Sequence, residues 1–195
     1  KPVKSFFSVF ASQVNNVKEL REILESSKSH LKKFVRPFNQ LLKEYTDFEF
    51  NADYLLAEEL LEGQQVTVEG FVYDNEVEII GLVDSIMFPN TISFQRFEYP
   101  SKLNKHIQER MSEIAEKFIK SMGFDNGIFN IEMIYNDKND KVSIIEVNPR
   151  MCSQFADLME KVHGTNTYEI QLALSLGIKP KFKRNAGKYK NAASI

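Results

Sequence analysis

The stretch from Ile128 to Arg150, IFNIEMIYNDKNDKVSIIEVNPR, contains two apolar runs separated by a polar linker. Runs rich in Ile, Val, Phe and Tyr that flank such a linker are typical of a β-hairpin. Each expected strand carries a carboxylate where a buried strand is normally apolar, Glu132 on the first and Glu146 on the second. Asn148 follows two residues later, so it shares a face with Glu146.

The hydrophobic pattern of this hairpin predicts its register. A loop with an odd number of residues, centred near Asn139, would place Glu132 opposite Glu146 and leave a clean apolar set on the other face. An even loop would scatter the carboxylates over both faces, because a one-residue slip inverts every side chain. We therefore predict an odd loop, with these side chains on the core face: Phe129, Ile131, Met133, Tyr135, Ile145 and Val147.

Two half-buried carboxylates that face each other need a shared proton or a cation, because like charges destabilise a sheet. Two Glu carboxylates and an Asn amide form an all-oxygen donor set, which suits Mg²⁺ or Mn²⁺ better than Zn²⁺. Mg²⁺ usually keeps waters and substrate phosphates in its other positions. Glu132, Glu146 and Asn148 therefore predict a nucleotide–metal site; the alternative is a solvated hairpin face with incidental acids.

Composition narrows the class of protein. The 195 residues suffice for one large domain or two small ones, and 43% hydrophobic residues support a genuine core. A net charge of −2 provides no basic face for nucleic acid, and the apolar runs are too short to span a bilayer. The single cysteine, Cys152, excludes an intramolecular disulfide and fits a reducing, cytoplasmic compartment. The chain starts without Met, so we expect both ends to continue in a longer protein.

The rest of the chain alternates between strand and helix patterns. Besides the hairpin, we expect strands over 10–14, 54–57, 65–73, 76–84 and 91–97. We expect helices over 17–27, 31–45 with a possible break before Pro37, 102–122, 153–163 and 167–176. This order predicts an α+β fold with mostly antiparallel strands.

Four features stand in order along the chain: Lys1-Pro2, a hinge-like Leu55 to Gly63 segment followed by Gln65, a meander, and the carboxylate hairpin that ends in E-V-N-P-R. This arrangement resembles the ATP-grasp superfamily, which includes biotin carboxylase, carbamoyl phosphate synthetase and D-alanine–D-alanine ligase. The resemblance implies ATP clamped between two α+β subdomains, here 1–57 as an incomplete lid and 58–195 with the hairpin. It also implies a preceding α/β domain, and no βαβ pattern in this chain could supply it.

The resemblance implies which residues bind the nucleotide. Lys1 would reach the α- and β-phosphates, and the hinge residues Glu58, Glu59, Leu60 and Leu61 would recognise adenine through their backbone. Gln65 stands where relatives often have a Glu that contacts the ribose hydroxyls. The alternatives are an exposed N-terminal Lys and two solvated turn acids. Many relatives also have a glycine-rich phosphate loop where this chain has Ser5-Phe6-Phe7-Ser8 without glycine, which leaves those phosphate contacts open.

For the reaction itself, the resemblance implies that Glu132, Glu146 and Asn148 hold one or two Mg²⁺ ions that bridge the β- and γ-phosphates. Arg150 would hold phosphate or an acyl-phosphate intermediate through its planar guanidinium. The alternative for Arg150 is an ion pair with one of the two glutamates. The partners implied are ATP, a small carboxylate and an amine, with no nucleic acid and no membrane.

Three functions follow as hypotheses. The first is the ATP-binding part of an ATP-dependent carboxylate ligase that forms C–N bonds, although the fragment alone need not be active. The second is a non-catalytic ATP-binding module of a larger protein, which the glycine-free loop and Gln65 favour. A metal-dependent hydrolase without nucleotide is the third, and it needs a second ligand cluster that the sequence lacks.

A few other residues carry weaker signals. We interpret His30, His106 and His163 as surface or helix-face histidines, because none has a partner at metal-ligand spacing. Cys152 is a poor candidate nucleophile without a nearby His. Asp84 ends an expected strand and could face a cleft, and its role is open.

Overall fold

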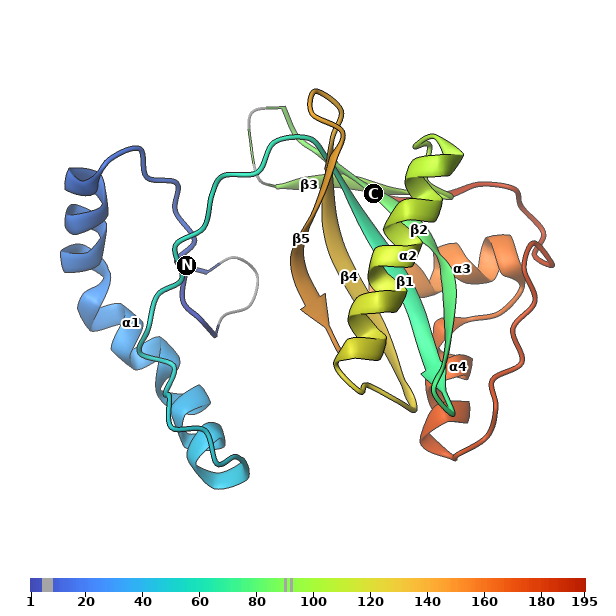
Figure 1. The fold of residues 1–195 in the computed structure, drawn as a ribbon, viewed down its shortest axis with the longest axis horizontal. Coiled ribbons are helices and arrows are strands. Elements are labelled where there is room, and N and C mark those ends of the chain that lie inside the picture. Colours follow the sequence, from blue (N-terminus) through green and yellow to red (C-terminus); the bar gives the residue numbers. More distant parts are fainter. Residues whose placement is uncertain (5–8, 90, 92) are drawn as a thin grey trace. The chain divides into compact units, whose positions relative to one another are not determined.

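A computed structural model gives the fold of residues 1–4, 9–89, 91 and 93–195, which divide into two compact units, Lys1–Leu60 and Leu61–Ile195. The predicted glycine-free loop over residues 5–8 lies outside the described residues. Figure 1 labels the main helices and strands. Among the described residues, no helix is both long enough and apolar enough to cross a membrane.

The described part of the second unit is built on a six-stranded sheet in the order β5-β4-β1-β2-β3-β6, and every neighbouring pair is antiparallel. The turn between β1 and β2 has positive φ at Asp74 and Asn75, as a two-residue type I′ hairpin requires. The strands are β1 (Gln64–Tyr73), β2 (Glu76–Met87), β3 (Phe94–Tyr99), β4 (Gly127–Asn136), β5 (Lys141–Asn148) and β6 (Ala192–Ser194).

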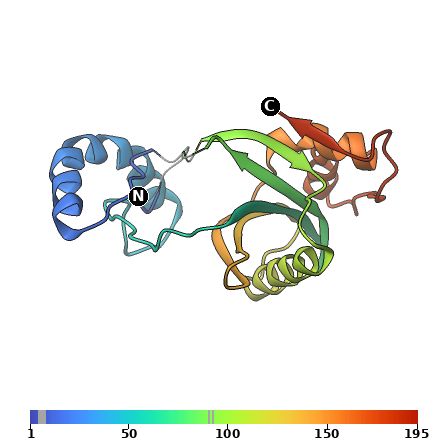
Figure 2. The ribbon, with the colours of Figure 1, turned by 90° about the horizontal axis from the view of Figure 1, so that it is seen from above.

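Helices cover both faces of this sheet (Figure 2). Helix α2 (Lys105–Ser121) buries Ile107, Met111 and Ala115 against one face, where Val66 and Val68 of β1 point. On the other face, the short 3-10 turn η1 (Ser153–Phe155) leads into α3 (Ala156–His163), and α4 (Thr167–Ser175) follows. These elements enclose a second apolar cluster with the β1 side chain of Phe71 and its neighbours. The alternation of β1 therefore supplies both cores.

The face under α3 and α4 changes character along β1. Phe71 lies in the apolar cluster, but Glu69, Thr67 and Gln65 continue the same face in the other direction. Their cross-strand partners on β4 include Asn130 opposite Glu69 and Glu132 opposite Thr67. One end of this face is thus apolar and helix-covered, while the other end gathers polar and acidic side chains.

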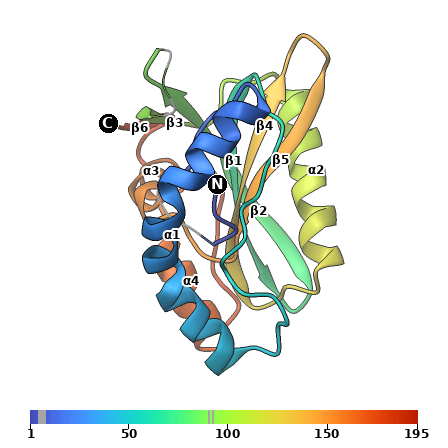
Figure 3. The same cartoon turned by 90° about the vertical axis from the view of Figure 1, so that its left-hand side faces the viewer.

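The first unit contains one long helix, α1 (Val17–Tyr45), which Figure 3 shows. Pro37 lies inside this helix without ending it. The prediction of two helices, over 17–27 and 31–45, was wrong because residues 28–30 continue the helix between them. The break considered before Pro37 does not occur either, and the apolar stripe continues past it: Leu31 and Val35 are buried with Ala52, and Phe38 packs beside them. Asn16 caps the helix by accepting a hydrogen bond from the backbone N–H of Glu19.

Two strands predicted in the first unit are not formed. Residues 10–14 adopt no strand, and the segment 54–57 contributes only an isolated bridge between Leu55 and Pro2. The second segment is also not buried, since the side chain of Tyr54 is 56% exposed. A short apolar run alone does not make a strand without neighbouring strands to pair with it.

The predictions were better for the second unit. The strands expected over 65–73, 76–84 and 91–97 correspond to β1, β2 and β3, with ends shifted by at most three residues. The helices expected over 102–122 and 167–176 are α2 and α4, and the one over 153–163 begins as η1 before α3. Strand β6 was not predicted because its three residues, AAS, carry no strand pattern.

Gly70 offers a test of this packing. A Cβ atom there would lie 2.5 Å from Cζ of Phe129 and 2.9 Å from the backbone oxygen of Glu78. We expect Gly70→Ala to lower the free energy of unfolding by about 1–3 kcal/mol through overpacking, as measured by urea denaturation. Combining it with Phe129→Leu should reduce that cost, and an unchanged midpoint for Gly70→Ala alone would contradict the packing described.

Candidate nucleotide and metal site

The hairpin of β4 and β5 brings its two acids together. Glu132 is the direct cross-strand partner of Glu146, and Asn130 is the partner of Asn148. Residues that pair directly in an antiparallel ladder lie on the same face, so all four side chains belong to the polar end of the sheet face. The predicted juxtaposition of Glu132 and Glu146 is confirmed.

The route to this register differs from the prediction. Asn136 pairs with Lys141, so the loop of residues 137–140 has an even number of residues. The register shifts between Glu132 and Met133 of β4, which pair with Glu146 and Ile144 of β5. Ile145 of β5 is therefore the extra residue of a β-bulge. The odd-loop prediction was wrong: the bulge, and not the length of the loop, places Glu132 and Glu146 on the same face of the sheet. Ile144, not Ile145, accordingly packs with the α2 core.

A chain of hydrogen bonds links the buried amides of the hairpin to Arg150. The Nδ2 group of Asn148 donates to Oδ1 of Asn130 at 3.1 Å, and Nδ2 of Asn130 donates to the backbone oxygen of Arg150 at 3.1 Å. The guanidinium of Arg150 returns to Oδ1 of Asn148 at 3.3 Å. Asn148 and Arg150, which were predicted separately as a metal ligand and an oxyanion-binding residue, are therefore brought together, both directly and through Asn130.

The two acids of the hairpin have different surroundings. Nε2 of Gln65 donates to Oε2 of Glu132 at 2.9 Å, so the predicted ribose-binding residue contacts a predicted metal ligand. The side chain of Glu132 is half-buried, whereas that of Glu146 is exposed and forms no ion pair among the described residues. Glu146 is therefore the more exposed of the two acids.

Glu69 of β1 lies on the sheet face that also carries Asn130 and Glu132, and it is fully buried. Its Oε1 accepts a hydrogen bond from the backbone N–H of Cys152 at 3.1 Å, while its Oε2 has no partner among the described residues. Burial raises the pKa of Glu69 to about 8, although the N–H of Cys152 and the charge of Arg150 pull it down. Glu69 is therefore protonated at neutral pH.

The first unit holds the other predicted nucleotide-binding residues. Nζ of Lys1 forms an ion pair with Glu58 at 2.5 Å, and the backbones of Lys1 and Leu56 exchange hydrogen bonds. Glu59 and Leu60 follow in an exposed segment without regular structure, and Leu61 begins the second unit. Lys1 and the start of the hinge segment are thus neighbours within one unit.

Comparison with known proteins decides the family. A family model described as the ATP-grasp domain matches residues 1–159. The chain belongs to the ATP-grasp family. The resemblance that the sequence carries and the predicted α+β antiparallel fold are both confirmed.

Solved structures share this ATP-grasp fold. Biotin carboxylase from Campylobacter jejuni, in a β-γ-ATP complex, matches with a TM-score of 0.66 and 19% identity over 92% of this chain and 37% of its own. Phosphoribosylglycinamide synthetase from Anaerococcus prevotii matches with a TM-score of 0.56 and 23% identity over 86% of this chain and 45% of its own. The chain thus spans less than half the length of either protein.

A third match is the biotin carboxylase domain of 2-oxoglutarate carboxylase from Hydrogenobacter thermophilus, in complex with MgADP and bicarbonate. Its TM-score is 0.61, with 17% identity over 84% of this chain and 33% of its own. Identities at this level show a common fold.

The donor set of this ATP-grasp hairpin fits a hard divalent cation. Two carboxylates, from Glu132 and Glu146, and the amide oxygen of Asn148 share one sheet face, and like charges placed opposite each other favour a cation between them. The described residues contain no group of three or more His, Cys, Asp or Glu side chains that could hold a metal ion. Because the donors of the hairpin are all oxygens, their chemistry suits Mg²⁺, with phosphate oxygens and waters in its other positions, rather than Zn²⁺.

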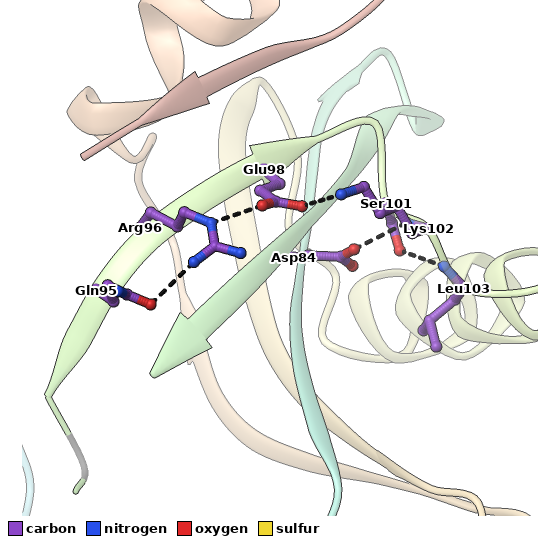
Figure 4. A network of polar contacts seen from close by, with 7 residues as sticks. All are labelled: Asp84, Gln95, Arg96, Glu98, Ser101, Lys102 and Leu103. Atoms are coloured by element: carbon purple, nitrogen blue, oxygen red, sulfur yellow. Dashed lines mark hydrogen bonds and ion pairs between the residues drawn. The ribbon is translucent and has the colours of Figure 1, made fainter. Parts of the chain in front are cut away.

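Asp84 lies elsewhere. It pairs with Val66, on the face that α2 covers, and β2 continues past it to Met87, so the expectation that it could face the cleft was wrong. Figure 4 shows its carboxylate aimed at the segment before α2, where Oδ2 accepts from the backbone N–H of Lys102 at 2.8 Å. Its strand neighbour Glu98 is paired with Arg96 and Lys102, which lower the pKa of that carboxyl. Asp84 has a structural role.

His163, predicted as a surface or helix-face histidine, lies at the end of α3, but it is buried rather than on the surface. Its Nδ1 accepts from the backbone N–H of Asn185 at 2.9 Å, so its Nε2 donates to the hydroxyl of Tyr99. Burial lowers the pKa of His163 to about 4, which keeps the ring neutral. Burial and the nearby Glu69 raise the pKa of Cys152 to about 11, in agreement with its prediction as a poor nucleophile.

Sequence reasoning missed two polar residues of the site, Asn130 and Glu69. A signal existed for each. Asn130 stands two residues before Glu132 and therefore shares its face, and Glu69 interrupts the apolar strand VTVEGFV. A buried carboxyl within a central strand is rare enough to indicate a function.

The raised pKa of Glu69 makes stability depend on pH. In the folded state burial keeps the proton on Glu69 up to its pKa of about 8, whereas in the unfolded chain the carboxyl loses it near the ordinary glutamate pKa of 4.5. Because the folded pKa is the higher one, the stability of the wild type is expected to fall between about pH 4.5 and 8 relative to Glu69→Gln, which cannot ionise. Urea denaturation at pH 5, 6.5 and 8 measures that difference.

The contribution of His163 to the pH dependence cancels in this comparison, because His163 titrates in the same way in the wild type and in Glu69→Gln. A stability difference between Glu69→Gln and the wild type that stays constant from pH 5 to 8 would contradict the burial of an ionisable Glu69.

Proposed function

We propose that this ATP-grasp domain binds Mg·ATP and serves an ATP-dependent carboxylate ligase. The observation that carries the proposal is the direct pairing of Glu132 with Glu146, two opposed carboxylates on the face that also holds Asn148 and Arg150. Such a pair disfavours a purely structural role, since like charges opposite each other destabilise a sheet. The solved ATP-grasp structures named above as ATP and MgADP complexes support the choice of ligand.

Within this proposal, Glu132, Glu146 and Asn148 hold the metal ion through their oxygens. The ion, when bound, neutralises charge on the β- and γ-phosphates and lowers the cost of phosphoryl transfer. Gln65 orients Glu132 through its 2.9 Å hydrogen bond and leaves an amide oxygen for a ribose hydroxyl. Lys1 would bind phosphate, and the backbone of Glu58, Glu59, Leu60 and Leu61 would bind adenine.

The proposed ligase reaction has two steps, and both develop negative charge that these cations would offset. A carboxylate oxygen of the substrate attacks the γ-phosphorus, the bond between that phosphorus and the leaving oxygen of ADP breaks, and an acyl-phosphate forms. An amine nitrogen then attacks the acyl carbon, phosphate leaves, and the nitrogen loses a proton. Arg150 would stabilise the anionic intermediate, because its planar guanidinium matches the geometry of an oxyanion pair.

A non-catalytic ATP-binding module is the second candidate, and one observation favours it. The amide of Gln65 occupies an oxygen of Glu132, and this hydrogen bond competes with metal coordination at that oxygen. Such a module would bind Mg·ATP in the intact protein without forming ADP in the presence of any carboxylate and amine.

The metal site is tested by Glu146→Gln in the intact protein. Loss of one of two carboxylates is expected to weaken binding of Mg·ATP at least about tenfold in calorimetry and to abolish ADP formation. Glu116→Gln on α2, an acid on the other side of the sheet that pairs with Lys120, is the matched control and should change neither. ADP formation by Glu146→Gln at the wild-type rate would refute the metal assignment.

The acyl-phosphate is tested separately. The intact protein is screened with Mg·ATP, hydroxylamine and a panel of amino acids and small carboxylic acids, and hydroxamates are measured by their ferric complex. We expect a hydroxamate with the true carboxylate, because hydroxylamine intercepts an acyl-phosphate. Amide product and ADP without hydroxamate would contradict the acyl-phosphate step, and ATP binding without ADP across the panel would favour the non-catalytic module.

A further inference from the structure

Two buried side chains hold the backbone on either side of Met151. Glu69 accepts from the N–H of Cys152 at 3.1 Å, and Asn130 donates to the backbone oxygen of Arg150 at 3.1 Å. Both side chains are buried and lie on neighbouring strands, β1 and β4, where they are direct cross-strand partners. The segment that carries Arg150 is thus anchored to the centre of the sheet just after β5 ends.

Stability alone does not account for Glu69. Its Oε2 is buried without a partner among the described residues, and an unsatisfied buried polar atom destabilises the folded state. An apolar side chain of similar volume would avoid this cost, since well-packed apolar replacements of buried polar groups are often neutral or stabilising. Within the described part of the chain, the contact with Cys152 is the one side-chain hydrogen bond of Glu69 that such a replacement would lose.

We propose that Glu69 is a positioning residue for Arg150: its carboxyl fixes the Arg150–Cys152 backbone so that the guanidinium meets the reacting oxyanion. This inference rests on the proposed function, in which Arg150 stabilises the intermediate. Glu69 touches no reacting atom in this account. Asn130 secures the other side of the same short segment.

The size of the effect follows from the geometry. Arg150 is exposed, and the hydrogen bonds of its guanidinium to Oδ1 of Asn148 and to the backbone oxygen of Met151 are long, 3.3 Å each. Its aim therefore depends on where its backbone is held. A misplacement of about 1 Å at a catalytic group can cost on the order of 100-fold in rate.

The test uses Glu69→Leu and Glu69→Gln in the intact protein. Glu69→Leu removes the acceptor, and we expect kcat to fall about 10- to 100-fold while the Kd for Mg·ATP stays within about twofold. Glu69→Gln keeps an acceptor oxygen and should restore kcat to within about threefold of the wild type. If Glu69→Leu does not fold, Glu69→Met replaces it as the unbranched side chain without an acceptor.

The decisive comparison repeats Glu69→Leu in the Arg150→Ala background. A residue that acts through Arg150 has nothing left to position there, so the second substitution should change kcat by less than about twofold. A merely structural defect would lower kcat equally in both backgrounds. Tyr99→Phe, which removes a buried hydroxyl from the contact with His163, is the control for loss of stability and should leave kcat unchanged.

The outcomes separate this inference from the proposed function. Wild-type kcat in Glu69→Leu, or an equal loss in both backgrounds, overturns the positioning role while leaving the metal and ATP assignments intact. Wild-type kcat in Arg150→Ala overturns the role of Arg150 itself, and the positioning role with it. Loss of kcat in Glu69→Leu, its rescue in Glu69→Gln and the absence of further loss in Arg150→Ala establish it.

Discussion

The extra residue at Ile145 determines which side chains of β5 face those of β4. Without the bulge, the pairing of Asn136 with Lys141 would continue to Ile145 opposite Glu132, and Glu146 would turn toward the α2 core. The bulge reverses this alternation, so that both acids and both amides of the hairpin share one face. Burying Glu146 as an unpaired charge would cost several kcal/mol, which explains why the local irregularity is retained.

The bulge places the acids on a sheet face that is itself divided into an apolar end and a polar end. The α3 and α4 helices cover one end of that face with an apolar cluster, and the other end gathers the polar side chains of β1, β4 and β5. The rigid end holds the strands in register, and the segment that leaves β5 returns to it through η1. Arg150 lies where that segment begins, between the buried amides of the hairpin and the apolar cluster that includes Met151. The exposed side chain of Arg150 therefore extends from a backbone segment that is hydrogen-bonded to the sheet.

Much of the second unit could be predicted from sequence, because alternation and helical periodicity are local signals. The pairing of Glu132 with Glu146 was predicted for the right reason, which is the exclusion of charge from the core. The predicted odd loop was wrong, because nothing in the local pattern distinguishes an odd loop from an even loop with a bulge. The first unit was predicted poorly, because strands over 10–14 and 54–57 need partners that a local pattern does not reveal. Glu69 was missed because its meaning depends on Cys152, which is distant in sequence and close only in the fold.

The central claim is that the opposed acids of the hairpin hold a divalent cation that carries the phosphates of ATP. Crystals of the intact protein grown with Mn²⁺ and a non-hydrolysable ATP analogue would test it by anomalous diffraction. The account predicts a manganese peak within coordination distance, about 2.0–2.3 Å, of oxygens from Glu132, Glu146 and Asn148. Manganese bound to the nucleotide but contacting none of these three side chains would contradict it.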